Sequence, residues 1–101
     1  MRVRVRWSPL AVMRAAEAAN YIAARSEVTG ERWVRGLFDA VKGLGRFPNR
    51  GRSVPEIGRA EIRELIYGSH RVVYRVSPRS VEILTVRHVR REFDPDEVEG
   101  G

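Results

Sequence analysis

Three consecutive runs of strand-forming residues in the C-terminal half of the chain restrict its fold more than any other feature. The runs cover residues 62–67, 70–76 and 81–89 and are rich in valine, isoleucine and tyrosine. Only Gly68 and Ser69 separate the first two runs, and a short segment with one proline separates the last two. Connections this short join antiparallel strands, because a parallel pair needs a crossover of about a dozen residues or more. The sequence therefore predicts an antiparallel meander of three strands.

The N-terminal half predicts one further strand and a first helix. Residues 2–7 alternate between arginine and an apolar side chain, which is the period of a half-buried strand. Ser8 and Pro9 follow as a helix start signal, and apolar residues at helical spacing continue to about Arg25. The apolar stripe of this helix is mostly alanine, so a neighbouring element can approach it closely.

A second helical pattern covers residues 31–44 and completes a helix hairpin. Its apolar stripe consists of Val34, Leu37, Phe38, Val41 and Leu44. The Gly- and Pro-rich segment 46–61 predicts a loop, in which we expect Phe47 to be the buried aromatic anchor. The resulting order is β-α-α-β-β-β, which predicts an α+β fold with the helix hairpin packed on an antiparallel sheet.

Charge divides the chain into a basic body and an acidic tail. All 19 basic residues lie at or before Arg91, and five of the 13 acidic residues fall in the last ten positions. Residues 1–91 therefore carry 19 minus 8, or +11, charges. We expect one domain at residues 1–93 and a mobile acidic tail at residues 94–101. A basic body of this kind attracts an acidic protein or a phosphate backbone.

Several classes of function are excluded or disfavoured by composition. The chain has no cysteine, which excludes disulfides and thiol chemistry. Its two histidines lie on different predicted strands without fixed carboxylate spacing, so we expect neither a metal site nor a cofactor. The N-terminus lacks the apolar core of about 7–15 residues found in signal peptides, and no run has membrane-spanning length. We therefore expect a soluble, cytoplasmic protein that does not act at a membrane.

Cationic side chains on the predicted strands and just after the last strand are the candidate binding residues. The set is Arg63, Arg71, Arg75, Arg87, His88, Arg90 and Arg91. For the sheet arginines, an alternative interpretation is a solvated or salt-bridged face with Glu64 and Glu82 as partners. For His88, the alternative interpretation is an ordinary side chain at the end of a strand that is hydrogen-bonded or solvated. The excess of positive charge at the end of the last strand favours contact with another macromolecule.

Several short motifs resemble a known family over nearly the whole chain. They are Phe47-Pro48 followed by Gly51-Arg52, the triplet Arg63-Glu64-Leu65, the strand Arg71-Val72-Val73-Tyr74, and Val86-Arg87-His88 followed by Arg90-Arg91. Together with the order of elements, they resemble the RelE/ParE superfamily of toxins from bacterial type II toxin-antitoxin systems. The resemblance implies the RelE/ParE-like fold and one of two activities, mRNA cleavage on the ribosome or poisoning of DNA gyrase.

The residues that match RelE-like enzymes are incomplete. The two lysines of those enzymes fall near Ile62 and Glu64, and neither residue supplies a cation. Arg71 matches an arginine of the family, but no tyrosine follows Tyr74, and Phe93 lacks the hydroxyl group. If the chain were an RNase, its catalytic residues would be His88, Arg71 and Arg90.

The resemblance therefore favours a ParE-like toxin that inhibits DNA gyrase and is neutralised by a cognate antitoxin, ParD-like or related. The alternatives are a RelE-like, ribosome-dependent mRNA endonuclease and an inactive or nucleic-acid-binding relative of the same fold. The implied antitoxin carries an acidic, amphipathic segment. We expect this segment to bind a groove between the alanine-lined hairpin and the sheet arginines Arg63, Arg71 and Arg75.

Overall fold

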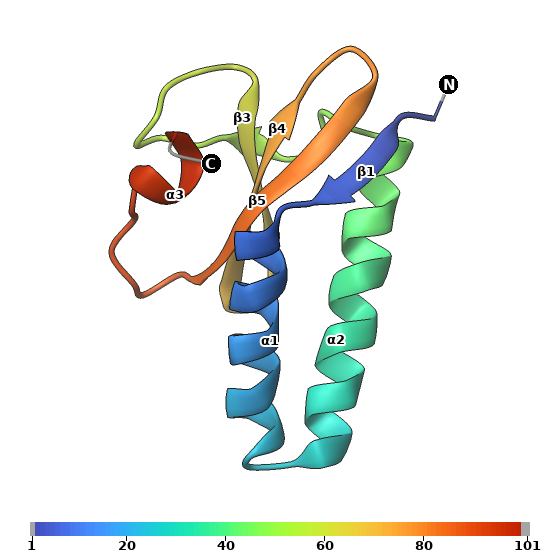
Figure 1. Ribbon diagram of the computed structural model, residues 1–101, viewed down its shortest axis with the longest axis vertical. Coiled ribbons are helices and arrows are strands. Elements are labelled where there is room, and N and C mark those ends of the chain that lie inside the picture. The colour runs from blue at the N-terminus through green and yellow to red at the C-terminus, as the bar shows by residue number, and fades with distance from the viewer. Residues whose placement is uncertain (1, 100–101) are drawn as a thin grey trace.

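Five strands form one mixed sheet in the order β1-β5-β4-β3-β2 (Figure 1). The computed structural model describes residues 2–99. The strands are β1 (Arg4–Trp7), β2 (Arg52–Ser53), β3 (Ile62–Tyr67), β4 (His70–Val76) and β5 (Ser80–His88). The predicted meander is confirmed as β3, β4 and β5, and Gly68 adopts a φ of 56° in the β3–β4 turn, a conformation that favours glycine.

The pairing of β1 differs from the sequence prediction of an antiparallel sheet. β1 runs parallel to β5, with Val5 opposite Val81 and Trp7 opposite Ile83. The helix hairpin and the other strands separate these two strands in the chain, so local sequence does not specify their relative direction. The other strand pairs are antiparallel.

Two helices follow β1 and lie side by side as an antiparallel hairpin (Figure 1). The first, α1 (Pro9–Ala23), is capped by the Ser8 hydroxyl, which accepts a hydrogen bond from the Ala11 N–H. The second, α2 (Glu27–Lys42), begins four residues earlier than predicted because Ser26 caps it in the same way. A 3-10 turn, η1 (Gly43–Gly45), follows. Within residues 2–99, no helix combines the length and apolar character needed to cross a bilayer.

The hairpin packs on one face of the sheet and forms the larger core. Buried residues of this core come from α1, α2, η1, β4 and β5, and they are Ala11, Leu37, Val41, Leu44, Val72, Tyr74, Val81 and Ile83. The Tyr74 hydroxyl donates to the Pro48 carbonyl and accepts from the Gly51 N–H, both at 2.9 Å. A Cβ atom at position 51 would lie 2.4 Å from the Glu64 carbonyl oxygen, so only glycine fits this approach.

The loop between α2 and β3 is anchored by a different residue from the one predicted. Phe47 was expected to be buried, but it is 60% exposed. Val54, which is fully buried, anchors the loop on the opposite face of the sheet. The adjacent strand β2 was not predicted, because it is only two residues long and shows no alternation of apolar and polar side chains.

The C-terminal segment, residues 89–99, folds back onto the sheet face opposite α1 and α2. It ends in the short helix α3 (Asp96–Glu99), which β5 separates from the helix hairpin in Figure 1. Val98 is fully buried in a second core with Val54, Ile62, Val73 and Leu84. This packing differs from the mobile tail expected at residues 94–101, of which residues 100 and 101 lie outside the described part. One apolar side chain among acids is too weak a sequence pattern to predict it.

Candidate functional site

The candidate cationic residues lie on two faces and at one end of the sheet. Arg71, Arg75 and Arg87 point toward α3, because each contacts a residue of the C-terminal segment. Arg63 and His88 lie on the face that carries α1 and α2, where their strand partners are Tyr74 and His70. The expected groove between the hairpin and Arg63, Arg71 and Arg75 is therefore not formed, since two of these arginines lie on the far side of the sheet.

Arg71 is the most enclosed of the candidate residues, with a side chain only 10% exposed. Its Nε donates to the buried Glu64, and its two terminal nitrogens donate to the two oxygens of Glu56 at 3.0 and 2.8 Å. The Phe93 ring lies 5.0 Å from the guanidinium carbon. The hydrogen bonds that Arg71 donates to Glu56 and to Glu64 raise the pKa of Arg71, so it stays charged at every physiological pH. These contacts leave little of its charge for an external phosphate.

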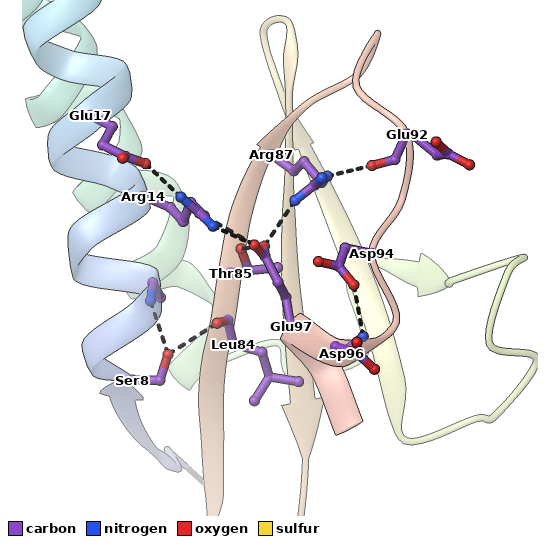
Figure 2. Close-up of polar contacts among 11 residues, drawn as sticks. Ser8, Arg14, Glu17, Leu84, Thr85, Arg87, Glu92, Asp94, Asp96 and Glu97 are labelled. Atoms are coloured by element: carbon purple, nitrogen blue, oxygen red, sulfur yellow. Dashed lines mark hydrogen bonds and ion pairs between the residues drawn. The ribbon is translucent and has the colours of Figure 1, made fainter. Parts of the chain in front are cut away.

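Arg87 is held by the C-terminal segment through Glu97 (Figure 2). One Glu97 oxygen accepts from Arg87 at 3.0 Å and from the Thr85 hydroxyl at 2.8 Å, and the other accepts from Arg14 of α1 at 2.6 and 3.1 Å. Arg87 also donates to the Glu92 carbonyl at 2.6 Å. The chain thus supplies its own carboxylate to Arg87, which the sequence predicted to contact another macromolecule.

The ionisation of Glu97 follows from these contacts. Burial by itself raises the pKa of Glu97, but hydrogen bonds from Arg14 and Thr85 and the nearby charges of Arg14 and Arg87 outweigh it. The net result is a pKa below the ordinary range for glutamate. Glu97 is therefore a carboxylate at neutral pH and links α3 to both α1 and β5.

Arg75 completes the row of paired arginines. It donates to Glu82 at 3.3 Å and to the Val98 carbonyl at 3.4 Å. Glu64 and Glu82 are the partners named in the alternative sequence interpretation, so this face is a salt-bridged sheet face. Glu56, Arg14 and Glu97 were missed because they come from segments distant in sequence, and no local pattern marks them.

His88 and Arg63 belong to the helix-bearing face. The His88 ring lies 5.2 Å from the His70 ring, and Trp33 of α2 lies 5.1 Å from His70. The backbone N–H of Arg90 donates to Nδ1 of His88 at 3.1 Å, while burial and then His88 lower the pKa of His70. Arg63 donates to the Gly51 carbonyl at 2.8 Å. The sheet separates His88 from Arg71, so the two do not form one catalytic group.

The last two candidates, Arg90 and Arg91, lie exposed in the turn after β5. Neither has a carboxylate partner within residues 2–99, which leaves both free to meet another molecule. In the same part of the chain, no cluster of three or more histidine, aspartate or glutamate side chains has the arrangement of a metal site.

Residues 5–93 match the protein family described as the ParE toxin of the type II toxin-antitoxin system, parDE. In Sinorhizobium fredii, the protein named "Putative toxin Y4kP" is 35% identical over 95 residues, which is 91% of this chain and 94% of that protein. The match therefore spans almost the whole described domain.

Solved structures of other proteins have the same fold. The chromosomal ParDE system of P. aeruginosa matches 86% of this chain and 96% of that chain, with a TM-score of 0.71 and 18% identity. The RelBE2 complex of Mycobacterium tuberculosis matches 87% of this chain and 99% of that chain, with a TM-score of 0.60 and 22% identity. The YoeB dimer of Staphylococcus aureus gives a TM-score of 0.58 at 17% identity, over 87% of this chain and 98% of that chain. At these identities the similarity establishes the fold alone.

Proposed function

We propose that this chain, which belongs to the ParE toxin family of type II toxin-antitoxin systems, arrests growth by inhibiting DNA gyrase and is silenced by a cognate antitoxin. The family match over residues 5–93 is the observation that carries this proposal, because it spans the helix hairpin and, apart from Arg4, all five strands of the sheet. It agrees with the sequence resemblance, which favours the ParE-like branch of the superfamily.

The arrangement of the arginines supports gyrase over the ribosome as the target. Cleavage of RNA needs free cations beside the phosphate and groups that move protons. Arg71 is enclosed by two carboxylates, Glu64 occupies a position where RelE-like enzymes carry a cation, and His88 lies on the other face. A gyrase inhibitor needs a binding surface instead, which exposed cations can provide.

Gyrase assays with the purified protein test this proposal. We expect the protein to increase the amount of cleaved plasmid trapped on gyrase, and to leave mRNA intact in a ribosome-dependent translation reaction. The His88→Ala variant should behave as the wild type in both assays, because His88 lies apart from Arg71. Codon-dependent mRNA cuts that disappear in His88→Ala would instead establish the endonuclease.

We further propose that the antitoxin is ParD-like and presents an acidic, amphipathic segment to this domain. The P. aeruginosa and M. tuberculosis relatives are both parts of toxin-antitoxin systems. Arg90 and Arg91 are exposed and without carboxylate partners within residues 2–99, so they suit the rim of such an interface. Rim charges act mainly on the rate of encounter.

The double variant Arg90→Glu with Arg91→Glu should therefore associate more slowly with the antitoxin and show a weaker dependence of the on-rate on salt. We expect a loss of affinity of about 1 kcal/mol or less per exposed pair. Stopped-flow association across a salt series measures both effects. The variant Arg25→Glu with Arg32→Glu is the matched control, since it changes the same charge near the connection between α1 and α2. Equal salt slopes for all three proteins would place Arg90 and Arg91 away from the antitoxin.

A further inference from the structure

An apolar groove with cations at its rim lies along β1 on the helix-bearing side. It has a volume of about 380 Å³ and is lined by Arg2, Val3, Val5, Trp7, Phe38, Val41, Lys42 and Gly45. Trp7 and Phe38 meet at 5.2 Å with their rings tilted by 56°, and Phe38 is 52% exposed. The groove thus presents aromatic surface to solvent next to two cationic side chains, Arg2 and Lys42.

Three regularly spaced arginines lie on and just before β1, which is an edge strand of the sheet. Arg2, Arg4 and Arg6 are exposed and alternate with Val3, Val5 and Trp7. Alternate residues of a strand lie about 6.6 Å apart. None of the three has an ion-pair partner within the described residues, although Arg6 lies opposite Glu82, which Arg75 engages. Arg4 and Arg6 therefore project from the α3 side of the sheet, whereas Val5 and Trp7 project into the groove on the helix side. Unlike Arg71, Arg75 and Arg87, which are all paired, these two edge arginines have no carboxylate partner within the described residues.

The turn between β4 and β5 adds one more cation to this edge. The Arg79 carbonyl accepts a hydrogen bond from the Arg4 N–H at 3.2 Å, and the Arg79 side chain is exposed. Charged residues on an edge strand often serve only to prevent sheet-to-sheet aggregation. That role accounts for the arginines but not for the exposed Phe38 ring in an apolar groove along the same edge.

We propose that this edge binds a single strand of nucleic acid that runs along β1, with an unpaired base against Trp7 and Phe38 on the helix side and phosphates against Arg2, Arg4 and Arg6 across the edge. Aromatic rings bind bases of any sequence, and arginine pairs with phosphate in a bidentate manner. Two nucleotides of a stacked strand rise about 6.8 Å, close to the spacing of alternate β1 residues. An unpaired base can enter the groove, whereas the bases of a duplex are already stacked. This site goes beyond the proposed gyrase inhibition and does not depend on it.

Fluorescence anisotropy with a labelled 12-nucleotide oligothymidylate and the full chain tests this site. Replacing Arg2, Arg4 and Arg6 together by Gln should weaken binding about ten-fold or more and reduce the salt slope by about 2, since each phosphate contact on a single strand contributes about 0.7. The matched control replaces Arg25, Arg32 and Arg35 by Gln, which removes the same charge from the α1–α2 hairpin. We expect the control to retain near wild-type affinity and slope. Equal losses of affinity in the two triple variants would contradict the proposed site, because they would show that binding depends on net charge alone.

Variants of Phe38 test the proposed contact with the base in the same binding assay. Phe38→Ala should weaken oligothymidylate binding about ten-fold, in the range of a lost base–aromatic stack. Phe38→Leu keeps an apolar side chain, so it should fold normally and still bind weakly. Wild-type affinity in Phe38→Leu would contradict the stacking role. Polyglutamate of the same charge should compete poorly, and effective competition would instead identify the edge as a surface for an acidic protein.

Discussion

Glu64→Ala is expected to lower the free energy of unfolding by about 3–5 kcal/mol, because it leaves a buried arginine without its enclosed partner. The Glu64 side chain is fully buried and binds both Arg71 and Arg52. Arg71 would retain only Glu56, whose side chain is partly exposed to solvent. Urea denaturation followed by circular dichroism measures the loss.

Two further variants distinguish the contribution of this ion pair to stability from the general effects of mutation. The double variant Glu64→Leu with Arg71→Met removes both charges and should recover most of the lost stability, since apolar residues often replace a buried pair without cost. Glu61→Ala, which removes a solvent-exposed carboxylate beside Arg59, should leave the stability close to that of the wild type, because solvent screens such a pair. A double variant as unstable as Glu64→Ala would show that the charge on Arg71 is not the cause.

Glu97→Ala is expected to lower stability by about 2–3 kcal/mol and to release α3 from the sheet. The substitution removes the shared carboxylate of Arg14, Thr85 and Arg87, and charge-assisted hydrogen bonds of this kind each contribute about 1.5–3 kcal/mol. The remaining cations can partly rehydrate, which limits the loss. Hydrogen exchange should show faster exchange at the Glu97 and Val98 amides than in the wild type.

The pH dependence of the stability that Glu97 contributes provides a second measurement. Its pKa in the folded protein lies below the ordinary value, so its stabilising effect is complete above the unfolded pKa of about 4.3 and is lost as pH falls through the folded pKa. The stability difference between wild type and Glu97→Gln should therefore be constant from about pH 7 to pH 5 and shrink at lower pH. A difference that persists unchanged at low pH would exclude the carboxylate as its source.

Local patterns predicted most of the secondary structure of this protein. The bounds of β3 and β4 agree with the predicted runs 62–67 and 70–76, because alternating residues and tight turns are encoded within a few positions. The start of α1 also followed from a local signal, the Ser8 cap with Pro9. The family resemblance rested on such local motifs and is confirmed by the match over residues 5–93.

Tertiary structure decided which charges meet and which side of the sheet each one faces. A bulge between Val73 and Tyr74 and the parallel pairing of β1 set the neighbours of each strand, and neither is visible in a local window. Arg14 and Glu97, 83 residues apart, become partners only when α3 folds back over β5. Sequence alone thus determined that this chain builds a basic ParE-like domain. The fold determined which arginines the chain neutralises with its own carboxylates and which it leaves exposed, because an ion pair depends on positions in space rather than on composition.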